Sequence, residues 1–126
     1  MRTTMSDAAT LYRNTAILSE EPTLATLLTG LRGVRTYLAR AARAVELGNG
    51  TAKVAAVTRA SELLTFLQAI TQPDGPASLG AALSGLYTSF NVRLTQAHAE
   101  DDVAAFRAIH AQIGLLETEL MTLADR

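Results

Sequence analysis

The chain has 126 residues, of which 48% are apolar, 18% charged and 5% aromatic. This length suits one domain with one hydrophobic core, and the apolar content is too high for a disordered chain. Eleven basic and twelve acidic residues give a net charge of −1, which leaves no basic footprint for nucleic acid or an anionic membrane surface. The absence of cysteine excludes thiol catalysis, thiolate metal sites and disulfides.

The first twenty residues predict neither a signal peptide nor a packed helix. Residues 1–10 are polar, and no apolar run in the chain approaches the roughly 18–20 residues of a membrane span. We therefore expect a cytoplasmic protein. Residues 1–20 have too few apolar side chains to build a layer of a core, so we predict that they form a short arm or helix beside the main domain.

Three clusters of turn-forming residues divide the rest of the chain. They are Gly48-Asn49-Gly50, the Pro-Asp-Gly-Pro run at 73–76 and the polar joint at 98–102. Between them, apolar residues recur at intervals of three and four, which is typical of helices. Thr51, Ser78 and Asp102 are candidate N-caps. We predict helices over residues 22–47, 52–72, 78–99 and 102–124.

Each predicted helix has a narrow apolar stripe, as in helices that pack nearly parallel to one another. The stripe of the first helix is Leu24, Leu27, Leu31, Val34, Leu38, Ala41 and Val45. The other three are Ala56, Ala60, Leu63, Leu67 and Ile70; Leu79, Leu83, Leu86, Phe90, Leu94 and Ala97; and Phe106, Ile109, Ile113, Leu116, Leu120 and Leu123. Short connections make sequential helices antiparallel neighbours. The predicted fold is therefore all-α: an antiparallel up-down four-helix bundle over residues 21–126, preceded by the arm.

Two sets of residues outside the stripes can be explained either by packing within the bundle or by a surface for a partner chain. Gly30 and Gly33 lie one turn apart inside a predicted helix, where glycine costs roughly 0.5–1 kcal/mol relative to alanine. They permit either close helix packing or a shallow trough for another chain. The aromatic residues Tyr12, Tyr37, Phe66 and Tyr87 form either a second, partly buried stripe or a surface groove for a partner helix, since tyrosine gives a large contact area at small entropic cost.

Enzyme signatures are mostly missing, and the sequence predicts no metal, no cofactor and no catalytic activity. His98 and the acidic residues 100–102 sit at a joint, where helix capping and solvation explain them. The alternative is a histidine phosphotransfer domain, because His110 is followed four residues later by Gly114. Ile113 replaces the lysine that would help to hold a phosphoryl group, so we favour a half-buried structural role for His110.

A run in the third and fourth predicted helices matches the spacing of a known family. Leu86-Tyr87, Arg93-Leu94, Gln96-Ala97 and Asp102 resemble the Leu-Tyr-Asp-Tyr, Arg-Leu, Gln-Ala-Asn and Asn-Asp run of FliS, the flagellar secretion chaperone for flagellin. Upstream, Tyr12, Asn14, Ser19 and Pro22, then Leu27-Leu28 and Gly30 or Gly33, are similar to its N-terminal Tyr-x-x-Asn, Thr-Pro and Leu-Tyr-Asp-Gly segments. Thr88-Ser89 and His98 depart from the pattern, and the tryptophan near the end of the last helix is missing.

The resemblance implies a cytoplasmic export chaperone that binds the C-terminal segment of flagellin, prevents its premature polymerisation and helps to deliver it to the export apparatus. The implied partners are flagellin and a flagellar export gate protein, with no nucleic acid and no membrane; the chaperone itself is expected to be a monomer or a weak homodimer. We expect Arg93 and Asp102 to have structural roles, Asp102 as a helix cap. The residues expected to bind flagellin or to form a lid are Tyr12, Ile17, Leu18, Gly30, Gly33, Tyr37, Tyr87 and Leu94.

The arm leads to a testable prediction. We expect Tyr12, Ile17 and Leu18 to cover part of the client groove when no client is bound. Deletion of residues 1–18 should then raise the affinity for flagellin or increase dimerisation of the free chain, because apolar surface is uncovered. Binding titrations and analytical ultracentrifugation measure the two effects. Unchanged affinity together with no new self-association would contradict the lid.

Overall fold

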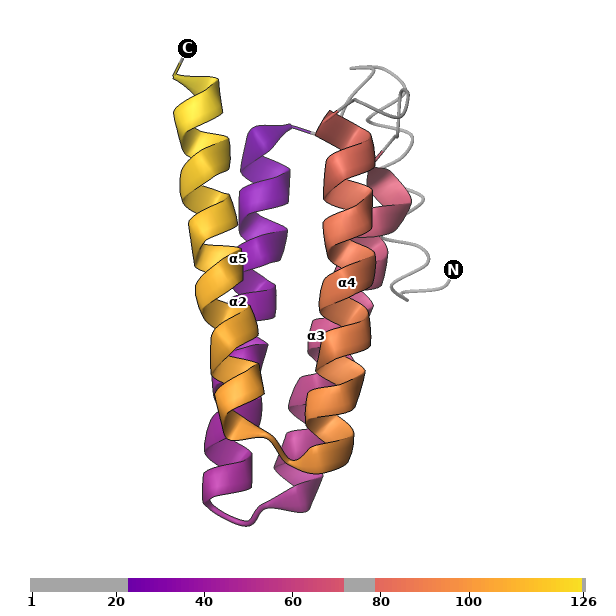
Figure 1. Ribbon diagram of the computed structural model, residues 1–126, viewed down its shortest axis with the longest axis vertical. Coiled ribbons are helices and arrows are strands. Elements are labelled where there is room, and N and C mark those ends of the chain that lie inside the picture. The colour runs from indigo at the N-terminus through magenta and orange to yellow at the C-terminus, as the bar shows by residue number, and fades with distance from the viewer. Residues whose placement is uncertain (1–22, 72–78, 126) are drawn as a thin grey trace, which may run out of the picture.

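The computed structural model describes residues 23–71 and 79–125, and these residues form four α-helices and no strand (Figure 1). The helices are α2 (Leu24–Glu46), α3 (Gly50–Ile70), α4 (Leu79–Glu100) and α5 (Val103–Ala124). They run alternately up and down, and each end lies within two residues of its predicted position. The chain is thus an all-α helical bundle, as predicted. The expected arm at residues 1–20 lies outside the described residues.

The four helices enclose one apolar core. Helix α2 packs against α3 and α5, whereas α4 packs against α3 and, least extensively, against α5. The predicted stripe of α2 is confirmed, since Leu31, Val34, Leu38 and Ala41 are almost completely buried. The largest fully buried side chains of the other helices are Leu64 and Leu67 of α3, Tyr87 and Leu94 of α4, and Phe106, Ile109 and Ile113 of α5.

The predicted stripes of α4 and α5 are wrong at several positions. Leu79 and Leu86 of α4 and Leu123 of α5 are exposed, while Tyr87 is completely buried. A shift of one residue rotates a helix face by about 100°, so Leu86 and Tyr87 cannot both point inward. The larger Tyr87 faces the core because it removes more apolar surface from water.

Helix α5 carries a buried carboxylate next to the leucine that the sequence assigned to the core. Glu117 is 4% exposed, whereas Leu116 is only half-buried. The Glu117 carboxylate accepts a hydrogen bond of 3.0 Å from Arg35 Nη2 and also pairs with Arg35 Nε. A buried charge is tolerated only when it is paired and hydrogen-bonded. This pair therefore fixes how α2 and α5 lie against each other.

The connection between α2 and α3 uses glycine and asparagine in succession. Gly48 has a positive φ of 68°, and its N–H donates to the Val45 carbonyl over 3.0 Å, which ends α2. The Asn49 side chain then caps α3 by accepting a hydrogen bond of 3.0 Å from the Ala52 N–H. The predicted cap at Thr51 is wrong, because Asn49 already satisfies the first turn of α3; Ser78 lies outside the described residues.

The connection between α4 and α5 has the same geometry with aspartates in place of glycine and asparagine. Asp101 adopts a positive φ of 52° after the end of α4. Lys53 of α3 pairs with the Asp101 carboxylate and donates to the His98 carbonyl over 3.3 Å, which satisfies the negative end of α4. Asp102 caps α5 by accepting a hydrogen bond of 3.0 Å from the Ala105 N–H, the role that its position in the sequence suggests.

Gly30 and Gly33 let α2 and α3 approach closely. A Cβ atom on Gly30 would lie 2.6 Å from Leu67 Cδ2, and one on Gly33 would lie 2.9 Å from Leu63 Cδ1. These leucines of α3 fill the space that the two glycines leave. Of the two explanations that the sequence left open, the structure supports close packing at Gly30 and Gly33 over a trough for another chain.

The contact at Gly30 predicts opposite effects of the same substitution at two glycines. Gly30→Ala should lower the free energy of unfolding by about 1–3 kcal/mol, because Leu67 is buried and has little room to move. Gly85→Ala should raise it by roughly 0.5–1 kcal/mol, since a Cβ there meets nothing within 4 Å and alanine favours the helix. Urea unfolding measures both, and equal stabilisation by the two substitutions would contradict close packing at Gly30.

Candidate functional site

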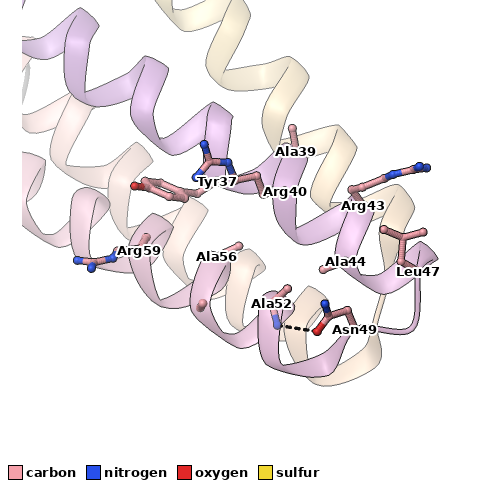
Figure 2. A pocket seen from close by; sticks show the side chains of 11 residues that line it. Tyr37, Ala39, Arg40, Arg43, Ala44, Leu47, Asn49, Ala52, Ala56 and Arg59 are labelled. Atoms are coloured by element: carbon pink, nitrogen blue, oxygen red, sulfur yellow. Dashed lines mark hydrogen bonds between the residues drawn. The ribbon is translucent and has the colours of Figure 1, made fainter.

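A large concave surface of the described residues lies between α2 and α3, in the half of the bundle nearer their connection (Figure 2). Its volume is about 690 Å³. We call it the α2–α3 groove. It is lined by Tyr37, Ala39, Arg40, Arg43, Ala44 and Leu47 of α2 and the turn after it, and by Asn49, Ala52, Ala55, Ala56 and Arg59 of the cap and first turns of α3.

Alanine side chains form the floor of the groove. Ala44 and Ala56 are buried between the two helices, whereas Ala52 and Ala55 are exposed along α3. A methyl group fills little of the valley between two helices, so a depression remains. In the other half of the same seam, Leu63 and Leu67 fill the corresponding space. The groove therefore follows from the change from leucine to alanine along α3.

The two ends of the groove differ in chemistry. At one end the Tyr37 ring lies beside the Arg40 guanidinium, whose central carbon is 5.3 Å from the ring centroid (Figure 2), within the range of a cation–π interaction. At the other end Leu47 is 64% exposed beside the apolar floor. A ligand that spans the groove would meet an aromatic ring at one end and an aliphatic side chain at the other.

The charged residues that line the groove are all arginines. Arg40 and Arg43 project from α2 and Arg59 from α3 (Figure 2), and the described lining residues include no carboxylate. Arg59 has a partner one turn away, Glu62, at 3.6 Å. Within the described part of the chain, Arg40 and Arg43 make no ion pair. The rim of the groove is thus positive although the whole chain has a net charge of −1.

A second, smaller groove of about 330 Å³ lies between α4 and α5. Its apolar wall includes the exposed Leu86 and Leu115, and its charged residues are Arg93 and Glu119. Arg93 Nη1 donates to the Gln112 side chain across the two helices. Arg93 therefore takes part in a polar contact between helices, but its partner is an amide and not the acidic residue that an ion pair requires.

The structure places Gly30 and Gly33 against leucines of α3 and separates the other expected binding residues into three groups. Tyr37 lines the α2–α3 groove. Tyr87 and Leu94 are 0% and 1% exposed, so the expectation that they face a client is not met, because both side chains point into the core. Burial also raises the pKa of Tyr87 above its usual value. The third group, Tyr12, Ile17 and Leu18, lies outside the described residues.

The structure gives little support to chemistry at His110. This residue is half-buried on α5, and the position of the missing lysine is occupied by Ile113, which is completely buried. No cation at that position can hold a phosphoryl group. Across residues 23–71 and 79–125, no three histidine or acidic side chains gather in a metal-binding cluster, including those around His98.

The helices of the described region fall short of the length and apolarity needed to cross a membrane.

Sequence reasoning missed the alanines and arginines of the α2–α3 groove. The available signal was alanine at positions of α3 that face solvent, where a bundle helix ordinarily carries charged or polar side chains. Ala52 and Ala55 are such positions. The spacing of Arg40 and Arg43 on α2 and of Leu47 directly after it, at intervals of three and four, places them along one side of that helix.

We expect replacement of Tyr87 and of Tyr37 by alanine to lower the free energy of unfolding by different amounts. Tyr87→Ala should lower the free energy of unfolding by about 3–5 kcal/mol, because it leaves a cavity in the core. Tyr37→Ala should cost about 1–2 kcal/mol, since the ring is only partly buried. Thermal or urea unfolding of both variants tests the difference, and equal losses would show that Tyr37 belongs to the core as much as Tyr87 does.

Comparison with known proteins identifies the family to which the chain belongs. No curated protein sequence matches the chain. The family model of the flagellar protein FliS matches residues 5–119, which covers all four helices except the last residues of α5. The chain therefore belongs to the FliS family of flagellar proteins.

Proposed function

We propose that the chain is an export chaperone that binds the C-terminal segment of flagellin in the cytoplasm, keeps it from polymerising too early and helps to deliver it to the flagellar export apparatus. Membership of the FliS family indicates a flagellar chaperone role and favours a non-enzymatic protein over a phosphotransfer domain. The observation that carries the finer proposal is the open, alanine-floored α2–α3 groove.

The shape of the groove suits a client that must be held and later released. Between Tyr37 and Leu47 the groove follows about three turns of α2, which is enough for a short helical segment. Its methyl-lined floor can accept the large apolar side chains of an amphipathic client, as in other helix-in-groove complexes. A client that is unfolded beforehand loses about 2–5 kcal/mol of the binding energy to ordering, which keeps the affinity moderate.

The proposal predicts that the chain co-elutes with flagellin and that the complex depends on the flagellin C-terminus. Removing the C-terminal segment of flagellin should abolish co-elution in size-exclusion chromatography, because the apolar face that fills the groove is then absent. Removing a segment of equal length from the flagellin N-terminus is the control and should leave the complex intact. Equal binding of intact and C-terminally trimmed flagellin would contradict the proposal.

A pair of matched variants tests whether the client binds in the groove. Leu47 and Val54 are 64% and 50% exposed, and only Leu47 lines the groove. Leu47→Gln should weaken flagellin binding by about 5- to 30-fold, the loss of roughly 1–2 kcal/mol of apolar contact. Val54→Gln should leave the dissociation constant unchanged. Isothermal titration calorimetry measures both constants, and an equal or larger loss in Val54→Gln would place the client elsewhere.

A further inference from the structure

We infer that the α2–α3 groove selects a partner helix whose apolar stripe is flanked by acidic side chains, with Arg40 and Arg43 as the residues that recognise the carboxylates. The inference rests on the proposed function, because it states the chemistry of the client segment that enters the groove. It adds a charge requirement, which neither family membership nor the shape of the groove contains.

The first argument is that two of the three arginines of the groove, Arg40 and Arg43, have no carboxylate partner among the described residues. Arg40 and Arg43 stand one turn apart on the α2 rim and make no ion pair within residues 23–71 and 79–125. By contrast, Arg32, Arg35 and Arg107 each lie beside a carboxylate, Glu117 or Glu46. Unpaired arginines on the rim of an apolar floor leave room for carboxylates from another chain.

The second argument is that the arginines are held where such carboxylates would arrive. The Arg40 guanidinium lies 5.3 Å from the centre of the Tyr37 ring, and stacking on an aromatic ring restricts where it can point. A planar guanidinium donates two parallel hydrogen bonds to one carboxylate. Arg43 is exposed one turn further toward the α2–α3 connection, so carboxylates spaced by one helical turn on a partner match the spacing of the two arginines.

The third argument is that the floor requires large apolar side chains from the partner. Ala52, Ala55 and Ala56 offer only methyl groups, so contact area comes from the partner inserting leucine-like side chains between them. An isolated phosphate or a nucleic acid backbone would use the arginines and leave this floor empty. A helix with an apolar stripe and acidic flanks uses both features at once.

Two synthetic peptides test the charge requirement directly. Both are amphipathic helices of about four turns with the same leucine stripe, and their flanks carry only glutamate in one and only lysine in the other. Fluorescence anisotropy with the full chain should show that the glutamate peptide binds at least about 10-fold more tightly. Its affinity should fall as ionic strength rises from about 0.05 to about 0.5 M, because the rim contacts are exposed to salt.

Charge reversal on the chain supplies the matched variants. Arg40→Glu/Arg43→Glu should weaken the glutamate peptide by at least about 10-fold and should bind the lysine peptide more tightly than the wild type does. Gln96→Glu/Ala111→Glu introduces two glutamates at exposed residues outside the groove and should bind both peptides as the wild type does. Circular dichroism and urea unfolding confirm that each double variant is folded.

The floor needs its own variant. Ala52→Trp places a bulky ring in the first turn of α3, at an exposed position of the groove, and should reduce binding of the glutamate peptide by at least about 10-fold. Equal binding of the two peptides by the wild type, or no loss in Arg40→Glu/Arg43→Glu, would overturn the charge requirement. Undiminished binding by Ala52→Trp would overturn the groove as the site.

Failure of this inference can be told apart from failure of the proposed function. If the C-terminal segment of flagellin binds the wild type and both double variants equally, the chaperone function stands and the charge requirement falls. If flagellin does not bind but the glutamate peptide does, the proposed function falls and the groove serves another acidic helix. If neither binds and the wild type dimerises through Arg40 and Arg43, the occupant is a second copy and the inference is overturned.

Discussion

The seam between α2 and α3 changes character along its length because the residues facing it change in size. In one half, Gly30 and Gly33 leave no side chain, and Leu67 and Leu63 of α3 occupy the space down to 2.6 and 2.9 Å from the missing Cβ positions. In the other half both helices present alanine, and a groove of about 690 Å³ remains open. The glycine–leucine contacts hold the two helices at a given distance. In the alanine half of the seam the side chains are too small to fill the space between helices at that distance. The close packing and the candidate binding surface therefore come from one interface between helices.

Polar contacts hold the remaining helices relative to this seam. The Glu117–Arg35 pair connects α5 to α2, and Lys53 connects the start of α3 to the end of α4. Such contacts are directional, so they specify how the helices are rotated about their axes where the apolar stripes alone would allow several arrangements. The least extensive contact, between α4 and α5, includes the Arg93–Gln112 hydrogen bond.

The helices, their order and their antiparallel arrangement could be predicted from the sequence because apolar periodicity and turn residues are local signals. The rotation of each helix could not, since adjacent apolar residues such as Leu86 and Tyr87 fit the same periodicity equally well. Glu117 was missed for a related reason: a charged residue enters the core only when a partner from a distant part of the chain, here Arg35, meets it. The site was missed because it is defined by small side chains, and alanine gives the same helical signal whether it packs or leaves a space.

The central claim is that the alanine floor of the α2–α3 groove contacts the C-terminal segment of flagellin. Methyl NMR spectra of the chain labelled at alanine, recorded with and without that segment, test the claim most directly because alanines occur on all four helices. Contact at the groove predicts the largest shift changes at Ala39, Ala52 and Ala55, and little change at the exposed Ala82 of α4 and Ala111 of α5. Shift changes confined to Ala82 and Ala111, with the groove methyl groups unmoved, would contradict it.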